Sequence, residues 1–68
     1  MEQRYIAFIQ DVLITIHENI RELGERKSFA DVEELSHIDG KLMAYYEMLA
    51  ILKTSADEFN IPKEKIGI

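Results

Sequence analysis

The sequence has 68 residues, no cysteine, one proline and a hydrophobic fraction of 47%. A chain of this length forms one domain with a marginal core, because short chains bury a small share of their surface. The lack of cysteine excludes disulfides and thiolate metal sites as sources of extra stability. The sequence therefore predicts one domain over residues 1–68, stabilised by close helix packing or by a partner subunit.

The charge is acidic, with 13 Asp and Glu against 8 Lys and Arg, for a net charge of −5. Nucleic acids and anionic membranes are bound by local cationic surfaces, whereas the densest basic stretches here, 25–27 and 63–65, each contain an acid. The sequence shows no secretory signal pattern and no apolar run near the roughly 20 residues of a membrane span. We expect a cytoplasmic protein with no membrane partner, and nucleic acid is disfavoured as a partner.

The first predicted element is a helix over residues 3–23. Its apolar residues recur every three or four positions, which is typical of one helix face: Ile6, Ile9, Leu13, Ile16, Ile20 and Leu23. Tyr5, Phe8 and Val12 widen that face to about 160°, because successive positions advance by about 100°. Gly24 follows the last apolar residue and is predicted to end the helix in a left-handed conformation. A loop over 24–28 comes next.

The second predicted helix covers residues 29–60. Ser28 and Asp31 have the spacing of an N-terminal cap pair. A stripe with alternating spacings of three and four then follows, as expected for a helix packed lengthwise against others: Leu35, Ile38, Leu42, Tyr45, Leu49, Leu52, Ala56 and Phe59. Asn60 can adopt the left-handed conformation, and Pro62 cannot continue the helix. An apolar tail, 61–68, completes the chain.

The dipeptide Asp39-Gly40 leaves an alternative open. It is a common turn sequence, and a glycine inside a helix costs about 1 kcal/mol relative to alanine. A break here would give a monomeric three-helix bundle. The apolar spacing nevertheless continues from Ile38 to Leu42 without interruption, so we favour one continuous helix.

The second half of the longer helix carries an excess of apolar residues. Over residues 42–52 only Glu47 is charged, and a helix that is apolar nearly all round needs cover on several sides. A short loop would place Ile16 beside Leu35 and Ile6 beside Tyr45, where the first helix ends. The register thus predicts that four residues have no neighbour within the chain: Leu49, Leu52, Ala56 and Phe59.

A second copy of the chain is the simplest cover for this overhang. The expected fold is therefore an all-α antiparallel hairpin of two long helices, which dimerises into a four-helix bundle. Tyrosine and methionine are frequent at protein interfaces, and the predicted interface combines them with the overhanging stripe: Met43, Tyr45, Tyr46, Met48, Leu49, Leu52, Ala56 and Phe59.

One motif has the spacing of a metal site. Glu34 and His37 match the Glu-x-x-His pattern of carboxylate-bridged metal bundles. Leu35 and Ile38 hold the core positions, however, which turns Glu34 to the flank and His37 outward. The acids of the first helix (Asp11, Glu18 and Glu22) project away from its apolar face. We therefore predict no metal, no cofactor and no catalytic residue, and do not expect an enzyme.

Two functional hypotheses remain, with a third behind them. The first is a small homodimeric interaction or regulatory protein, of adaptor or inhibitor type, whose partners are itself and another protein. The second is an RNA-binding dimer of helical hairpins, which requires four cations to converge on one face: Arg4, Arg21, Lys41 and Lys53. The third is the metal-binding bundle. The steep salt dependence of phosphate contacts distinguishes RNA binding from protein binding.

Overall fold

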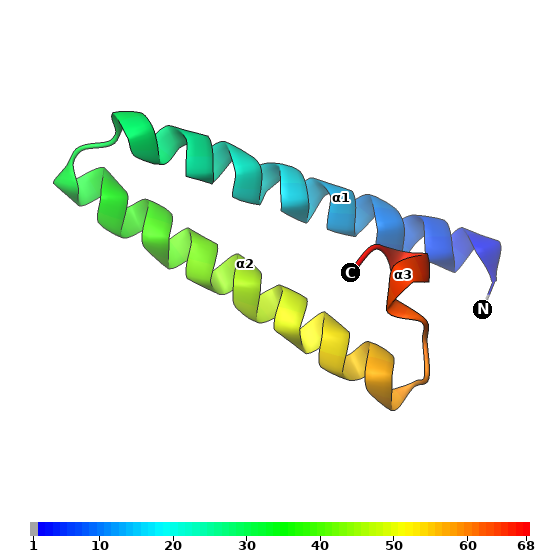
Figure 1. Cartoon of the computed structure of the whole chain (residues 1–68). Helices are drawn as coiled ribbons and strands as arrows, with labels where there is room; N and C mark the ends of the chain where they lie inside the picture. Colours follow the sequence, from blue (N-terminus) through cyan, green and yellow to red (C-terminus); the bar gives the residue numbers. More distant parts are fainter. Residues whose placement is uncertain (1) are drawn as a thin grey trace.

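Two long antiparallel helices and a short third helix make up the fold (Figure 1). The computed structural model describes residues 2–68. Helix α1 spans Gln3–Arg26, a 3₁₀ turn spans Lys27–Phe29, α2 spans Val32–Glu58 and α3 spans Lys63–Ile66. These residues contain no strand. The predicted all-α helical hairpin is confirmed.

The connection between α1 and α2 differs from the predicted loop over 24–28. Helix α1 runs through Gly24, which is not in the left-handed conformation, and ends at Arg26. Glu25 and Arg26 favour the helix by their intrinsic propensity, so the helix has no reason to stop at the glycine. The cap of α2 is Asp31 rather than Ser28: its Oδ1 accepts a 2.8 Å hydrogen bond from the Glu34 N–H. Helix α2 therefore begins at residue 32 and not at 29.

Helix α2 is continuous through Gly40, so the three-helix alternative is wrong. The apolar stripe on either side of the glycine keeps one phase, and Ile38 and Leu49 are both buried. The burial of these two side chains outweighs the cost of about 1 kcal/mol that a helical glycine carries. The helix ends at Glu58, two residues before the predicted end.

The tail over 61–68 folds back onto the hairpin. Asn60 has a φ of 55°, as predicted, and the Ile61 N–H donates to the Ala56 carbonyl at 2.8 Å. These features reverse the chain, and Pro62 then precedes the single turn of α3. The side chain of Ile66 is buried, with 3% of its surface exposed. The Gln10 side chain fixes the turn by donating a 2.6 Å hydrogen bond to the Lys65 carbonyl.

The register between α1 and α2 is shifted from the predicted one. Asn19 Nδ2 donates to the Tyr45 hydroxyl at 3.1 Å, whereas the prediction placed Ile6 beside Tyr45. The longer α1 and the later start of α2 account for the shift, because they move the hairpin turn towards the C-terminus. As a result α1 runs beside nearly the whole of α2. The prediction that Leu49, Leu52 and Ala56 lack intrachain neighbours is therefore wrong.

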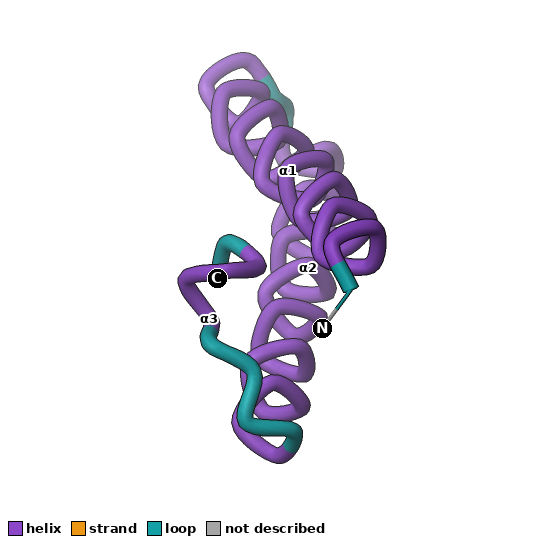
Figure 2. The backbone as a smooth tube through the Cα atoms, turned by 90° about the vertical axis from the view of Figure 1, so that its right-hand side faces the viewer, coloured by secondary structure: helices purple, strands orange, loops and turns teal. Residues whose placement is uncertain are grey.

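The core lies between the helices near their open end. Its buried members come from all three helices: Leu13, Ile16, Leu49, Ala56 and Ile66. Half-buried residues that pack against them include Ile9, Ile20, Tyr45 and Leu52. Figure 1 shows α1 and α2 diverging from the turn, with α3 where they are furthest apart. In the orthogonal view α3 lies to one side of the hairpin (Figure 2). The molecule measures 45 × 20 × 13 Å between Cα atoms, so it is an elongated plate.

Candidate protein-interaction surface

The predicted interface residues fall into three groups by exposure. Leu49 and Ala56 are buried within the chain. Tyr45 and Leu52 are half-buried against the core. The other four are exposed: Met43, Tyr46, Met48 and Phe59. Only this last group has a large share of its surface exposed, between 45% and 74%.

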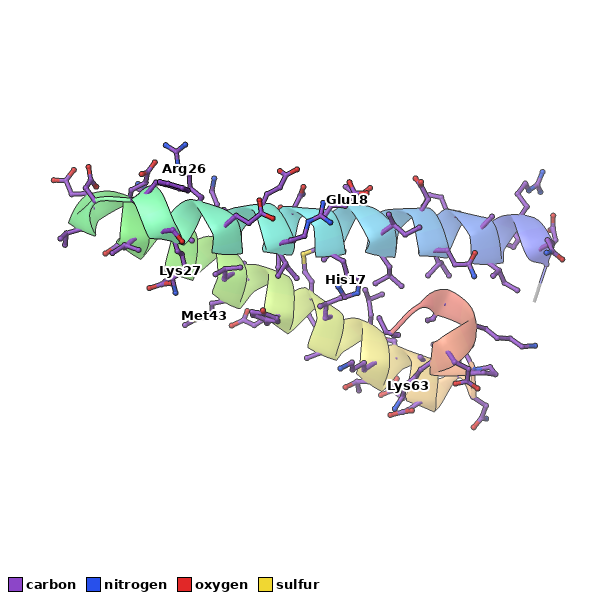
Figure 3. All side chains as sticks on the ribbon, turned by 45° about the horizontal axis from the view of Figure 1, so that its top comes forward. His17, Glu18, Arg26, Lys27, Met43 and Lys63 are labelled. Atoms are coloured by element: carbon purple, nitrogen blue, oxygen red, sulfur yellow. The ribbon has the colours of Figure 1, made fainter. Side chains whose placement is uncertain are left out.

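The four exposed residues do not share one side of α2. Since positions advance by about 100° around a helix, Met43 and Tyr46 lie on one flank of the buried stripe, and Met48 and Phe59 lie on the other. Figure 3 shows Met43 on the side of α2 turned away from α1. The structure therefore divides the predicted interface between two surfaces.

Four further exposed apolar residues continue the flank of Met48 and Phe59. They are Ile51 on α2, and Tyr5, Phe8 and Val12 on α1. We call the resulting set the open-end patch: Tyr5, Phe8, Val12, Met48, Ile51 and Phe59. The sequence contained a signal for the α1 members, because these three residues widen its apolar face beyond what a single α2 helix can cover. Ile51 was missed because it lies outside the main stripe of α2.

An apolar hollow adjoins the open-end patch at Phe59. It has a volume of about 130 Å³ and is lined by side chains of α1, α2 and the tail: Ile9, Leu52, Ser55, Ala56, Phe59, Ile61 and Ile66. Apolar hollows of this kind accept side chains from a binding partner. The patch thus combines protruding aromatic side chains with a recess.

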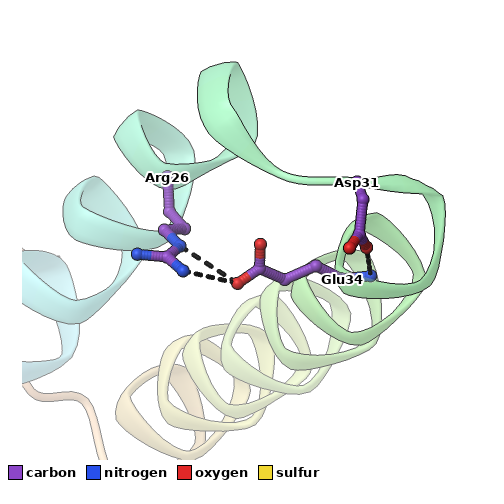
Figure 4. A network of polar contacts seen from close by, with 3 residues as sticks. All are labelled: Arg26, Asp31 and Glu34. Atoms are coloured by element: carbon purple, nitrogen blue, oxygen red, sulfur yellow. Dashed lines mark hydrogen bonds and ion pairs between the residues drawn. The ribbon is translucent and has the colours of Figure 1, made fainter.

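The hairpin turn carries a network of polar contacts (Figure 4). Both Nε and Nη2 of Arg26 donate to Glu34 Oε1, at 3.1 and 2.6 Å. Asp31 caps the first turn of α2 through the N–H of the same Glu34. Lys27 forms an ion pair with Asp39 at 3.0 Å. These contacts fix the connection between α1 and α2.

The Glu-x-x-His motif lies in this polar region. The Glu34 carboxylate binds Arg26, while His37 is exposed and shares a surface hollow with Glu33 and Ser36. Within residues 2–68 no three His, Asp or Glu side chains come together as metal ligands. His17 lies on the α3 side of α1 and lines a hollow with Ile66 (Figure 3).

The four cations required for an RNA site lie apart. Arg4 is 3.3 Å from Glu2, and Arg21 is 4.0 Å from Glu25, measured between nitrogen and carboxylate oxygen. Lys41 and Lys53 lie about 18 Å apart along α2. The described part of the chain also contains no helix that is long and apolar enough to cross a membrane.

The open-end patch is therefore the most distinctive feature of the surface. Its six side chains are between 41% and 74% exposed, although aromatic and large aliphatic residues belong to the class that proteins usually bury. Comparison of the chain with protein-family models, with curated proteins and with solved structures finds no match.

Proposed function

We propose that the protein is a small interaction protein of adaptor or inhibitor type, which works by binding and not by catalysis, and which does so as a homodimer. The observation that carries this proposal is the exposed apolar surface. Eleven large hydrophobic residues among those described are more than 40% exposed, against five buried ones. Six of them form the open-end patch, and contiguous apolar patches are typical of protein-interaction sites.

The small size of the core supports the homodimer. Full burial of one large apolar side chain stabilises a protein by about 1.5–3 kcal/mol, and a whole domain is stable by only about 5–15 kcal/mol. Burial of even half of the exposed residues against a partner therefore changes the free energy of unfolding by a large fraction of its total. A second copy of the chain is available wherever the first is, and two-fold symmetric dimers are the commonest homo-oligomers.

The polar groups support binding rather than catalysis. Throughout residues 2–68 no polar or charged side chain is buried, whereas catalytic groups are usually placed in recesses where burial tunes their acidity. The charged side chains lie at the surface, where five ion pairs form among those described.

Sedimentation velocity of the full chain over about 1–100 μM tests the proposal; this range brackets the dissociation constants of weak to moderate dimers. We expect a species of twice the 7.9 kDa monomer mass, with dissociation on dilution. A monomer that stays helical at every concentration contradicts the homodimer. Binding of single-stranded RNA that weakens steeply with salt contradicts the protein-interaction assignment and favours the RNA alternative.

A further inference from the structure

The two flanks that form the open-end patch face the same side of the hairpin. Asn19 lies seven residues after Val12 and Lys41 lies seven before Met48, so each shares its flank, since seven residues are close to two helical turns. Asn19 and Lys41 line one surface hollow together with Glu22, Leu23, Arg26 and Tyr45. The α1 row and the α2 row of the patch therefore belong to one face, which we call the patch face.

Helix α3 covers the other side of the hairpin. Gln10, Ile14 and His17 of α1 line a hollow with Ile66 and Gly67, and these three residues lie on the flank opposite Val12. Lys63 of α3 binds Asp57 at 3.0 Å, on the flank of α2 opposite Met48. Figure 2 shows the same arrangement, with α3 on one side of the two long helices. No segment of residues 2–68 covers the patch face in this way.

The dimensions of the patch face match what a stable dimer requires. The Cα atoms of the plate extend over 45 × 20 Å, an outline of about 900 Å², which is of the same order as the accessible surface of about 800 Å² that each partner buries in a standard interface. The centre of such interfaces is apolar and rich in aromatic residues, and the rim is polar. The open-end patch has this composition, and the ion-paired Arg4 stacks over the Tyr5 ring at its rim, 5.6 Å from the centroid.

Charge at the other half of the patch face favours a second copy in one orientation. Glu22 and Lys41 lie at the same level of the hairpin, because they line the same hollow. Neither belongs to an ion pair in residues 2–68. A two-fold axis along the length of the plate places α1 of one copy on α2 of the other. Glu22 then lies at the level of Lys41 of the partner subunit twice, once on each side of the axis.

We propose that a second copy of the chain docks on the patch face, with the two hairpins parallel and α1 of each packed on α2 of the other. The inference rests on the proposed homodimer and specifies its interface. It leaves α3 and the flank of Met43 and Tyr46 on the outside, where another protein has access to them.

Cysteine crosslinking tests this arrangement, because the natural chain contains no cysteine. Ser55 lies at the level of Ile9, since both line the apolar hollow, so Phe8 of one copy lies over Ser55 of the other. A mixture of the Phe8→Cys and Ser55→Cys proteins is oxidised mildly. We expect a covalent heterodimer as the main product, because a disulfide forms only when the two Cα atoms lie within about 7 Å.

A control pair and sedimentation together distinguish failure of the proposed interface from failure of the homodimer. The Ile14→Cys and Ala50→Cys pair sits at a similar level on the α3 side, and we expect it to stay unlinked. Crosslinking of this control pair, or preferential linking of Phe8→Cys with itself, overturns the proposed interface while self-association stands. A monomer in sedimentation removes the homodimer as well.

A second measurement does not depend on oxidation. Phe8→Ser is expected to weaken dimerisation by about 30-fold or more, as the loss of a central aromatic residue does in protein interfaces. Ile14→Ser is the matched control, since it is an exposed apolar residue of the same helix on the opposite flank, and its dimer affinity should stay within about threefold. Circular dichroism verifies that both variants keep their helices. Equal loss of affinity in the two variants overturns the proposal.

Discussion

The two ends of the hairpin are held together by different forces. At the turn, α1 and α2 are joined by hydrogen bonds and ion pairs among exposed side chains, with Arg26 and Glu34 at their centre. At the open end, the helices diverge and α3 brings the buried Ile66 against Leu13 and Ala56. The contacts at the turn are thus polar and local in sequence, apart from the buried Ile38 in the second turn of α2. The contacts at the open end are apolar and join residues far apart in sequence.

This difference indicates how stability is distributed. Exposed ion pairs contribute about 0–1 kcal/mol each, whereas removing a buried aliphatic side chain costs about 2–5 kcal/mol. The turn sets which residues of α1 and α2 meet, and the open end supplies most of the energy. The following substitutions test this contrast at progressively smaller effects.

The largest effect is expected from Ile66→Ala. The substitution removes the buried anchor of α3 and opens a cavity beside Leu13, so the free energy of unfolding should fall by about 2–5 kcal/mol. Urea denaturation followed by circular dichroism at fixed protein concentration measures the change. Ile14→Ala is the matched control, because Ile14 is 57% exposed and its loss should change stability by less than about 0.5 kcal/mol. A loss of stability for Ile66→Ala as small as that for Ile14→Ala would show that α3 contributes little to the stability of the open end.

An intermediate effect is expected from Asp31→Ala at the turn. The side chain of Asp31 accepts the Glu34 N–H at the start of α2, and loss of such a cap costs about 1 kcal/mol. Ser28→Ala tests the cap that the sequence suggested, and we expect it to change stability by less than about 0.5 kcal/mol. Thermal unfolding of the two variants distinguishes the two caps. A larger loss for Ser28→Ala would place the start of α2 earlier than residue 32.

The smallest effect is expected from the Arg26 and Glu34 ion pair. Both side chains are substantially exposed, so a double-mutant cycle of Arg26→Ala and Glu34→Ala should give a coupling energy of about 0.2–1 kcal/mol. The coupling should decrease as the salt concentration rises, because exposed charges are screened. A coupling above about 2 kcal/mol, unchanged at high salt, would show that the turn is more than a local constraint.

The sequence was sufficient to predict the helices and the hairpin. The spacings of three and four around Leu13 and Leu49 are long and regular enough to determine two helices, and the unbroken phase past Gly40 correctly favoured one continuous α2. The ends of the helices were harder to predict. Ser28 and Asp31 are both good capping residues, and Gly24 is a good terminator, so local chemistry alone did not distinguish the real boundary from its neighbours.

The interface prediction depended on those boundaries. A shift of a few residues at the turn moved α1 along α2, which buried Leu49 and Ala56 that the sequence had left uncovered. The residues against which the tail docks were also difficult to foresee, since Ile66 is separated from Leu13 by most of the chain. The widened apolar face of α1 remained as a visible signal, and it is this face that supplies Tyr5, Phe8 and Val12 to the open-end patch.

The hydrogen bond between Asn19 and Tyr45 has a consequence for alternative alignments of the two rods. Apolar stripes with regular spacing fit together almost equally well when one rod slides past the other by a turn. Sliding would separate the amide from the hydroxyl and leave each without its partner in a partly dry environment, which costs about 1–3 kcal/mol. A single polar pair near the middle of the molecule thus disfavours shifted registers of α1 and α2 that the aliphatic contacts alone would tolerate.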